Sequence, residues 1–236
     1  MVVFETSYSL SEECEIYNQL TRNELDAIII THTLLEEDEL KERVRDKVAV
    51  VCNEPLKTKK FDVFSLDEDE AVYSATRYLL KKGLSHLLFC ADDERTQLQK
   101  QRWEGFVRAH RDLNITITKD QKISGYSSIE DGILLGDEIF SEQSRYDGII
   151  SGSDFLAAGI VTSAIKHNVL LNENLFIIGF DNHPICLTTS PALSSIENQT
   201  DKMVKDVVAC LLDRLAGHEF STIRKVYKGE LIIRGS

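Results

Sequence analysis

Two apolar stretches of this sequence end in polar side chains that could hold a ligand. FIIGFDNHPI (176–185) begins with four apolar residues and a glycine and then reaches Asp181, while DGIISGSD (147–154) ends in Ser153 and Asp154. In open parallel α/β sheets, ligands bind outside the carboxyl ends of the strands. If both stretches are strands, they deliver Asp181, Ser153 and Asp154 to the place where a ligand would sit.

A structural alternative stays open at each of these positions. Ser153 or Asp154 would also serve as the N-cap of the helix that follows, because Ser and Asp side chains accept hydrogen bonds from the free amide groups there. Asp181 would also stabilise a loop through an Asx turn. The residue types alone do not separate these roles from ligand binding.

The elements that must position these residues alternate between strand-like and helix-like patterns. Apolar runs rich in Val, Ile and Phe occupy residues 2–6, 25–31, 48–53, 61–66, 86–91, 146–153 and 174–181, and the last run, 225–235, is also extended in pattern. Amphipathic helical patterns occupy residues 67–82, 96–110, 128–140, 154–167 and 201–215. Runs that are apolar on both faces are typical of parallel strands covered by helices. The alternation predicts an α/β protein with parallel sheets.

The charge of the chain argues against direct binding to nucleic acid. Among its 236 residues 42% are hydrophobic, which is enough for one large domain or two small lobes, and the net charge of −12 would repel a DNA backbone. No apolar segment approaches the roughly 18 residues of a membrane span. The first residues, MVVFE, have neither the basic nor the apolar region of a signal peptide.

Metal, redox and cofactor chemistry lack their usual motifs. The five cysteines (Cys14, Cys52, Cys90, Cys186 and Cys210) are scattered singly, which favours small buried thiols in a reducing cytoplasm over a metal site or a disulfide set. The sequence contains no GxxxxGKS/T, no GxGxxG after a strand, no GxSxG and no HExxH. We therefore expect neither a metal nor a cofactor.

The order of several motifs points to a known family. Residues 146–199 read YDGIISGSDFLAAGIVTSAIKHNVLLNENLFIIGFDNHPICLTTSPALSSIENQ, and LDAIIIT (25–31), QRWEGF (101–106) and GELIIRGS (229–236) lie around them. These segments resemble the effector-binding core of the lac/galactose repressor family of bacterial transcription regulators. That family has an apolar strand leading into Gly-Phe-Asp-Asn, an Arg-x-x-Gly-Phe/Tyr element and a closing Leu-x-x-Arg-x-Ser strand. The resemblance covers essentially the whole chain.

The resemblance implies a periplasmic binding protein-like fold of type I. In it, two doubly wound parallel-sheet lobes face each other across a cleft and are joined by a three-stranded hinge. We expect the N-lobe at residues 1–66 plus 197–222 and the C-lobe at 67–196 plus 223–236. The family's DNA-binding head and its first strand and helix have no counterpart in the chain, so we expect poor stability or self-association.

The resemblance also implies ligand contacts in the cleft. Arg102 matches the family's cleft arginine and Asp181 its cleft aspartate, a pair that suits a polyol because Asp accepts from vicinal hydroxyls while Arg donates a planar fork. The structural alternative for Arg102 is a salt bridge on a helix surface. Two further candidates are Ser153 and Asp154, which stand where the family usually has Asn-Asp. Asn198 stands where Gln is usual, and Ser127, with its neighbour Tyr126, stands where some members have a stacking aromatic. The last candidate is Asn53, at the end of VAVVCN.

These expectations combine into one favoured function and two alternatives. The favoured hypothesis is the effector-sensing and dimerisation core of a cytoplasmic, sugar-responsive regulator, which binds a sugar or sugar phosphate, forms a homodimer and contacts operator DNA only through a head that this chain lacks. A solute-binding receptor of a transport system would need a secretory signal and few free thiols. An enzyme would need a nucleophile–base pair or a metal cluster, whereas Asp181 and Arg102 offer recognition without a proton shuttle.

Overall fold

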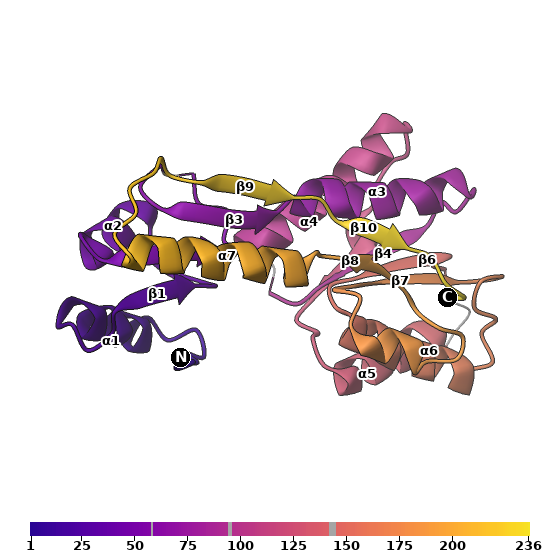
Figure 1. Ribbon diagram of the computed structural model, residues 1–236. Helices are drawn as coiled ribbons and strands as arrows, with labels where there is room; N and C mark the ends of the chain where they lie inside the picture. The colour runs from indigo at the N-terminus through magenta and orange to yellow at the C-terminus, as the bar shows by residue number, and fades with distance from the viewer. Residues whose placement is uncertain (58, 94–95, 142–144) are drawn as a thin grey trace. The chain divides into compact units, whose positions relative to one another are not determined.

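A computed structural model describes residues 1–57, 59–93, 96–141 and 145–236 (Figure 1). The chain divides into two compact units, the first formed by Met1–Leu66 with Gln199–Tyr227 and the second by Asp67–Asn198 with Lys228–Ser236. The chain therefore passes between the units three times. Residues 197 and 198, expected in the N-lobe, lie in the second unit, where strand β8 (Ser194–Glu197) extends to residue 197.

The first unit is built on a four-stranded parallel sheet of order β1-β2-β3-β9. Its strands are β1 (Ala27–Ile30), β2 (Val48–Cys52), β3 (Asp62–Leu66) and β9 (Arg224–Tyr227), and its helices are α1 (Leu10–Thr21), α2 (Glu37–Val44) and α7 (Thr200–Leu215). Helices α1 and α2 share a core with the strands, in which Leu20 and Leu40 pack near Val51 and Val63.

Helix α7 buries one apolar stripe and exposes another. Met203, Val207 and Cys210 are buried, and the helix contacts β1, β2 and β3. Next to this stripe, four apolar side chains are exposed: Val204, Val208, Leu212 and Leu215. Exposed apolar surface of this extent is the usual mark of an interaction surface or of an aggregation risk.

Residues 2–6 form no strand, so the prediction of a strand there is wrong. Val2, Val3 and Phe4 are exposed, with 68%, 82% and 40% of their surface accessible. The first strand of the sheet is β1, which pairs with β2 alone. A strand needs a neighbour for its backbone hydrogen bonds, and residues 2–6 pair with no strand in the described part of the chain.

The extended run at 225–235 is divided between the two units. β9 runs parallel to β3 in the first unit, whereas β10 (Glu230–Ile232) runs antiparallel to β8 in the second. Residues 223–227, expected in the C-lobe with the rest of 223–236, therefore lie in the first unit. Gly229 lies between the two strands, where an added Cβ would come within 2.8 Å of the Ala71 side chain.

The second unit is built on a six-stranded sheet of order β10-β8-β7-β6-β4-β5, in which only β10 is antiparallel. The remaining strands are β4 (Leu87–Ala91), β5 (Lys122–Ser124), β6 (Gly148–Ser151) and β7 (Phe176–Phe180). Helices α3 (Glu68–Lys81) and α4 (Gln97–Asp112) cover one face, and α5 (Ile129–Phe140) and α6 (Asp154–Lys166) cover the other (Figure 1). The prediction of an α/β fold with parallel sheets is confirmed.

The two helix pairs of this unit pack closely through glycines. A Cβ on Gly105 of α4 would overlap the carbonyl of Asp69 on α3. Gly132 of α5 and Gly159 of α6 face each other in the same way, each against a backbone carbonyl of the opposite helix. This close packing lets each pair cover its face of the sheet as a continuous layer.

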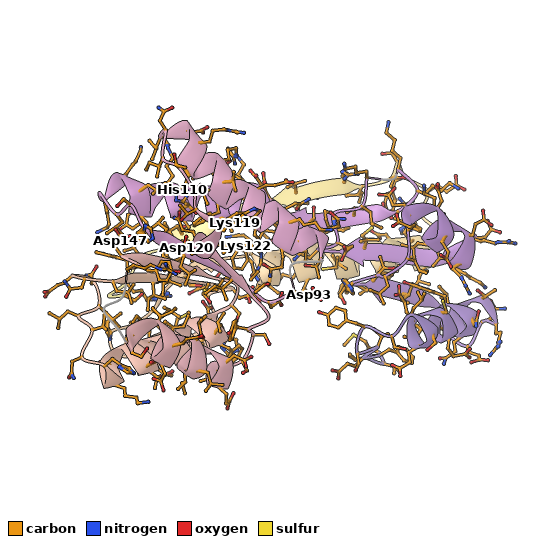
Figure 2. All side chains as sticks on the ribbon, turned by 180° about the vertical axis from the view of Figure 1, so that it is seen from behind. Asp93, His110, Lys119, Asp120, Lys122 and Asp147 are labelled. Carbon is orange, nitrogen blue, oxygen red and sulfur yellow. The ribbon has the colours of Figure 1, made fainter. Side chains whose placement is uncertain are left out.

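A fully buried histidine on α4 predicts acid sensitivity. His110 has 0% of its surface exposed, and its Nδ1 lies 2.9 Å from the carbonyl oxygen of Phe106 (Figure 2 labels His110). Burial lowers the pKa of His110, because a charged imidazolium would lose its solvation. Below about pH 6.5, the ordinary pKa of histidine, His110 therefore binds a proton more readily in the unfolded chain than in the folded chain. Proton binding then favours the unfolded state.

We therefore expect the native protein to lose stability relative to His110→Phe as the pH falls below about 6.5, by at most about 1.4 kcal/mol per pH unit. Urea denaturation of both proteins at pH 7.5 and 5.5 measures this difference. If the two free energies of unfolding change in parallel between these pH values, His110 does not control the acid response.

Candidate functional site

The carboxyl ends of the parallel strands in the second unit gather the predicted ligand residues at one edge of the sheet. Ser153 and Asp154 follow β6, Asp181 follows β7, and Asn198 follows β8. In Figure 2, Asp93, which follows β4, marks this end of the unit, while Asp120 and Asp147 mark the opposite end, where strands begin. This arrangement is where ligands bind in open α/β sheets.

Arg102 on α4 is held from several sides, and only 8% of it is exposed. Its Nε donates a 2.6 Å hydrogen bond to Oε2 of Glu68, and its Nη1 donates a 3.0 Å bond to the carbonyl oxygen of Gly152. The guanidinium carbon lies 3.6 Å from the centre of the Phe180 ring, a cation–π contact. The structural alternative for Arg102 is a salt bridge on a helix surface; Arg102 does form a salt bridge, but the pair with Glu68 is buried.

Asp181 is presented at the end of β7 by an unusual backbone conformation. Its φ is +100°, a left-handed value that few non-glycine residues adopt and that is typical of functional sites. Its amide donates to the carbonyl of Ile196 at 2.8 Å, and its Oδ1 accepts a 2.7 Å hydrogen bond from Nδ2 of Asn198. The structure thus brings Asp181 and Asn198 together.

Asp181 and Arg102 are near enough to affect each other electrostatically. Although the residue is exposed, partial loss of solvation around its carboxyl group raises the pKa of Asp181, the Arg102 charge lowers it, and the charges of Asp154 and Glu68 raise it again. The net direction is upward. Asp181 is therefore a carboxylate whose negative charge is only partly compensated by its protein neighbours.

Asp154 has a structural role that the sequence pattern does not reveal. Only 1% of it is exposed, its Oδ1 accepts from the Ser195 hydroxyl at 2.6 Å, and its Oδ2 accepts from the His183 amide at 2.6 Å. A Cβ on Gly179 would collide with this carboxylate. The glycine before Phe180 therefore gives Asp154 the space to hold the loop that carries Asp181.

The other candidates occupy supporting positions. Ser153 is the N-cap of α6 and accepts from the Leu156 amide at 3.2 Å. Ser127 is exposed and its amide donates to Asp131, while Tyr126 packs partly against the core of α5 and α6. Asn53 belongs to the first unit, where it ends β2 with a φ of +64° and accepts from the Leu66 amide at 2.9 Å.

Glu68 and Phe180 were missed by the sequence patterns. Glu68 begins an acidic first turn of α3, which the helix dipole alone explains, and its buried side chain gives no sign in the sequence. Phe180 reads as one more apolar residue of a strand. Successive residues of a strand point to opposite faces of the sheet, so Gly179 points toward Asp154 on α6 and Phe180 toward Arg102 on α4. Only this alternation would have shown that Phe180 contacts Arg102.

The described residues include no group of three or more His, Cys, Asp or Glu side chains arranged to hold a metal ion. Across the same described ranges, no helix combines the length and apolar character that crossing a membrane requires.

Comparison with known proteins identifies the family. Residues 76–236 match the periplasmic binding protein-like domain, and the chain belongs to this family. It is 29% identical to the NTD biosynthesis operon regulator NtdR of Bacillus subtilis, over 100% of this chain and 72% of that protein. It is 23% identical to the HTH-type transcriptional repressor CytR of Escherichia coli K12, over 100% of this chain and 70% of the repressor.

Solved structures show the same fold. A LacI-family sugar-binding transcriptional regulator from Escherichia coli, complexed with phosphate, superposes with a TM-score of 0.87 at 22% identity, covering 100% of this chain and 85% of that one. A LacI-family regulator from Lactobacillus casei with bound sucrose gives 0.90 at 18% identity, covering 100% and 87%. Together with the curated relatives, which are transcription regulators, these similarities support the core of a regulator rather than a transport receptor.

The contact between Gly179 and Asp154 gives a prediction about stability. Gly179→Ala should lower the free energy of unfolding by about 3 kcal/mol, because the new methyl group displaces a buried, hydrogen-bonded carboxylate. The loss should be smaller by about 1–3 kcal/mol when Asp154 is already Ala, since the two side chains no longer compete for space. Urea denaturation of the native protein, Gly179→Ala, Asp154→Ala and the double variant measures how strongly the two positions depend on each other. If the losses in the free energy of unfolding simply add, the contact between Gly179 and Asp154 does not matter.

Proposed function

We propose that this chain is the effector-sensing core of a LacI-type transcription regulator and that it binds a small saccharide-like effector at the carboxyl edge of the six-stranded sheet. The observation that carries the proposal is the placement of Asp181, in a left-handed backbone conformation, beside the buried guanidinium of Arg102. Relatives that match the full length of the chain are regulators, which supports the same function.

The chemistry of the pair suits hydroxyl-rich molecules. Nε and Nη1 of Arg102 are occupied by Glu68 and Gly152, and Nη2 makes no hydrogen bond to the described residues, so it remains as a donor. Asp181 has Oδ2 as an acceptor, since Asn198 occupies Oδ1. One donor and one acceptor, both fixed in position, can recognise neighbouring hydroxyl groups of one ligand.

The contact between Asp181 and Asn198 supplies a route from ligand to regulation. Asn198 is the last residue of the second unit before the chain passes to Gln199, which has a φ of +60° and precedes α7. On this proposal, an effector that binds Asp181 also acts on a residue at a connection between the units. The effector can change the activity of the regulator only if it binds two conformational states of the protein with different affinities.

We propose further that two copies of the chain associate through the second unit. A groove of 340 Å³ runs beside α6, and its lining includes Ala158, Ile165 and Ile185. Ile165 is 51% exposed, and Leu187, in the same segment as Ile185, is 69% exposed. A homodimer would cover this apolar surface, and dimers are the commonest symmetric assembly of soluble proteins.

The remaining parts of the proposal concern location and DNA. The regulator relatives and the five free cysteines support a cytoplasmic protein without enzymatic activity. CytR is an HTH-type repressor, and the chain spans 70% of its length. We propose that operator DNA is read by a helix-turn-helix segment outside these 236 residues, since this acidic chain would repel a phosphate backbone.

Calorimetric titration against mono- and disaccharides tests the proposed binding site. For the saccharide that binds, Asp181→Ala should weaken affinity by about tenfold to a hundredfold, the loss expected for a charge-assisted hydrogen bond. Glu173→Ala is the matched control, because Glu173 is an exposed carboxylate just before β7, at the other end of the same strand. Equal losses for both variants, or no saccharide binding at millimolar concentration, would contradict the proposal.

Sedimentation measurements test the proposed dimer. Ile165→Lys should convert it to a monomer, because a lysine at the interface would bury a charge without a partner. Leu212→Lys, on the exposed stripe of α7, should leave the dimer intact. The opposite pattern would place the interface on α7.

A further inference from the structure

The loop that carries Asp181 continues directly into a second left-handed residue. Asn182 has a φ of +51°, and Asp181 before it has a φ of +100°. Side chains other than glycine adopt such values at a cost in energy, which is smallest for asparagine and aspartate. Two such residues in succession persist only where the surrounding structure holds them. The direction in which the Asp181 carboxylate leaves the sheet therefore depends on what holds Asn182.

The side-chain amide of Asn182 is bonded to a charged group at each end. Its Oδ1 accepts a 2.6 Å hydrogen bond from Nη2 of Arg234, and its Nδ2 donates a 2.9 Å bond to Oε2 of Glu197. The backbone amide of Asn182 donates to the Ser195 hydroxyl oxygen at 3.0 Å. Hydrogen bonds to ionised groups are shorter and stronger than those between neutral groups. The orientation of this amide is therefore fixed by the charges of Arg234 and Glu197.

Arg234 reaches the loop from the last segment of the chain, 52 residues away in the sequence. It follows β10, the strand that pairs with β8, and it is partly buried. Its Nη1 donates a 2.8 Å hydrogen bond to the carbonyl oxygen of Leu193, and its backbone amide donates to the Ser194 hydroxyl oxygen at 3.0 Å. A guanidinium can hold two acceptors at once because its donors form a rigid, planar fork. Arg234 thus joins the start of β8 to the loop that follows β7.

We propose that Arg234 is a positioning residue for the ligand site, which acts through the Asn182 side chain and sets the direction of the Asp181 carboxylate without touching the effector. The inference rests on the proposed function, because it concerns the same site. A carboxylate that is already oriented loses less conformational freedom when a ligand binds, so the affinity is higher. Asp154 holds the same loop from the side of α6 and Arg234 from the side of β8, which fixes the loop from two directions.

The experiment begins with calorimetric titration of the native chain with six probe sugars: glucose, galactose, mannose, ribose, sucrose and maltose. For a sugar that binds, Arg234→Met should weaken affinity by about tenfold, because the side chain of Asp181 must then be ordered when the sugar binds. Arg224→Met is the matched control. Arg224 also donates to a backbone carbonyl, that of Leu56 at 2.6 Å, but it lies on β9 in the first unit. Its loss changes the net charge equally and should leave affinity within about twofold of the native value.

A second variant reaches the same site without removing the arginine. Asn182→Gly deletes the amide that Arg234 holds, while glycine adopts a φ of +51° without strain, so the fold is retained. This variant should also weaken sugar affinity by about tenfold, for the same reason as Arg234→Met. Because it leaves the bond from Arg234 to Leu193 in place, it decides the matter even if Arg234→Met does not fold.

The double variant separates positioning from a purely structural role. If Arg234 acts through Asn182, Arg234→Met should weaken affinity by less than about twofold when residue 182 is already glycine. A role confined to the Leu193 carbonyl would give the same loss with either residue at position 182. Thermal unfolding followed by circular dichroism identifies a temperature at which all of these proteins are folded, and the titrations are made there.

The outcomes distinguish this inference from the function on which it rests. If a sugar binds the native chain and Asn182→Gly equally tightly, or if Arg234→Met causes the same loss with asparagine and with glycine at position 182, Arg234 does not position the site, while the saccharide site stands. If none of the six sugars binds the native chain at millimolar concentration, the proposed function fails, and the inference fails with it.

Discussion

The arrangement of the candidate site depends on how the guanidinium of Arg102 is held. A cation that is 8% exposed requires compensation, and Glu68, the Gly152 carbonyl and the Phe180 ring supply it from three different elements. These contacts tie the first turn of α3, the end of β6 and the end of β7 to a single side chain of α4. The position of Asp181, one residue after Phe180, follows from this packing. Removing any one of these partners would leave the buried charge of Arg102 less well compensated.

The opposite face of the same strand is organised by a second charge. Asp154 lies beneath the loop after β7 and holds it through Ser195 and the His183 amide, and Gly179 leaves the space that this requires. In the segment Gly179-Phe180-Asp181, each residue therefore faces a different neighbour: the buried carboxylate, the buried guanidinium and solvent. The sequence shows only a hydrophobic strand here, whereas in the structure three consecutive residues have three different surroundings.

The features that depend on local pattern could be predicted from the sequence, and those that depend on partners could not. The α/β class follows from apolar runs separated by amphipathic stretches, and Asp181 stands at a strand end because FIIGF has the length and composition of a buried strand. The run at 2–6 has similar composition, yet it pairs with no strand of the described structure, and composition alone does not show whether a run has a pairing partner. The division of 225–235 likewise depends on two different neighbours, β3 and β8. The role of Glu68 could not be predicted, because acidic residues are common in the first turn of a helix and the sequence does not show that Glu68 contacts the guanidinium of Arg102.

A crystal structure of the chain with the saccharide that binds most tightly tests the central claim most directly. The account predicts that polar atoms of the ligand lie within hydrogen-bond distance of the Asp181 carboxylate and of Nη2 of Arg102, at the carboxyl edge of the six-stranded sheet. A ligand bound at the opposite edge, near Asp120 and Asp147, with Asp181 and Arg102 unchanged, would contradict it.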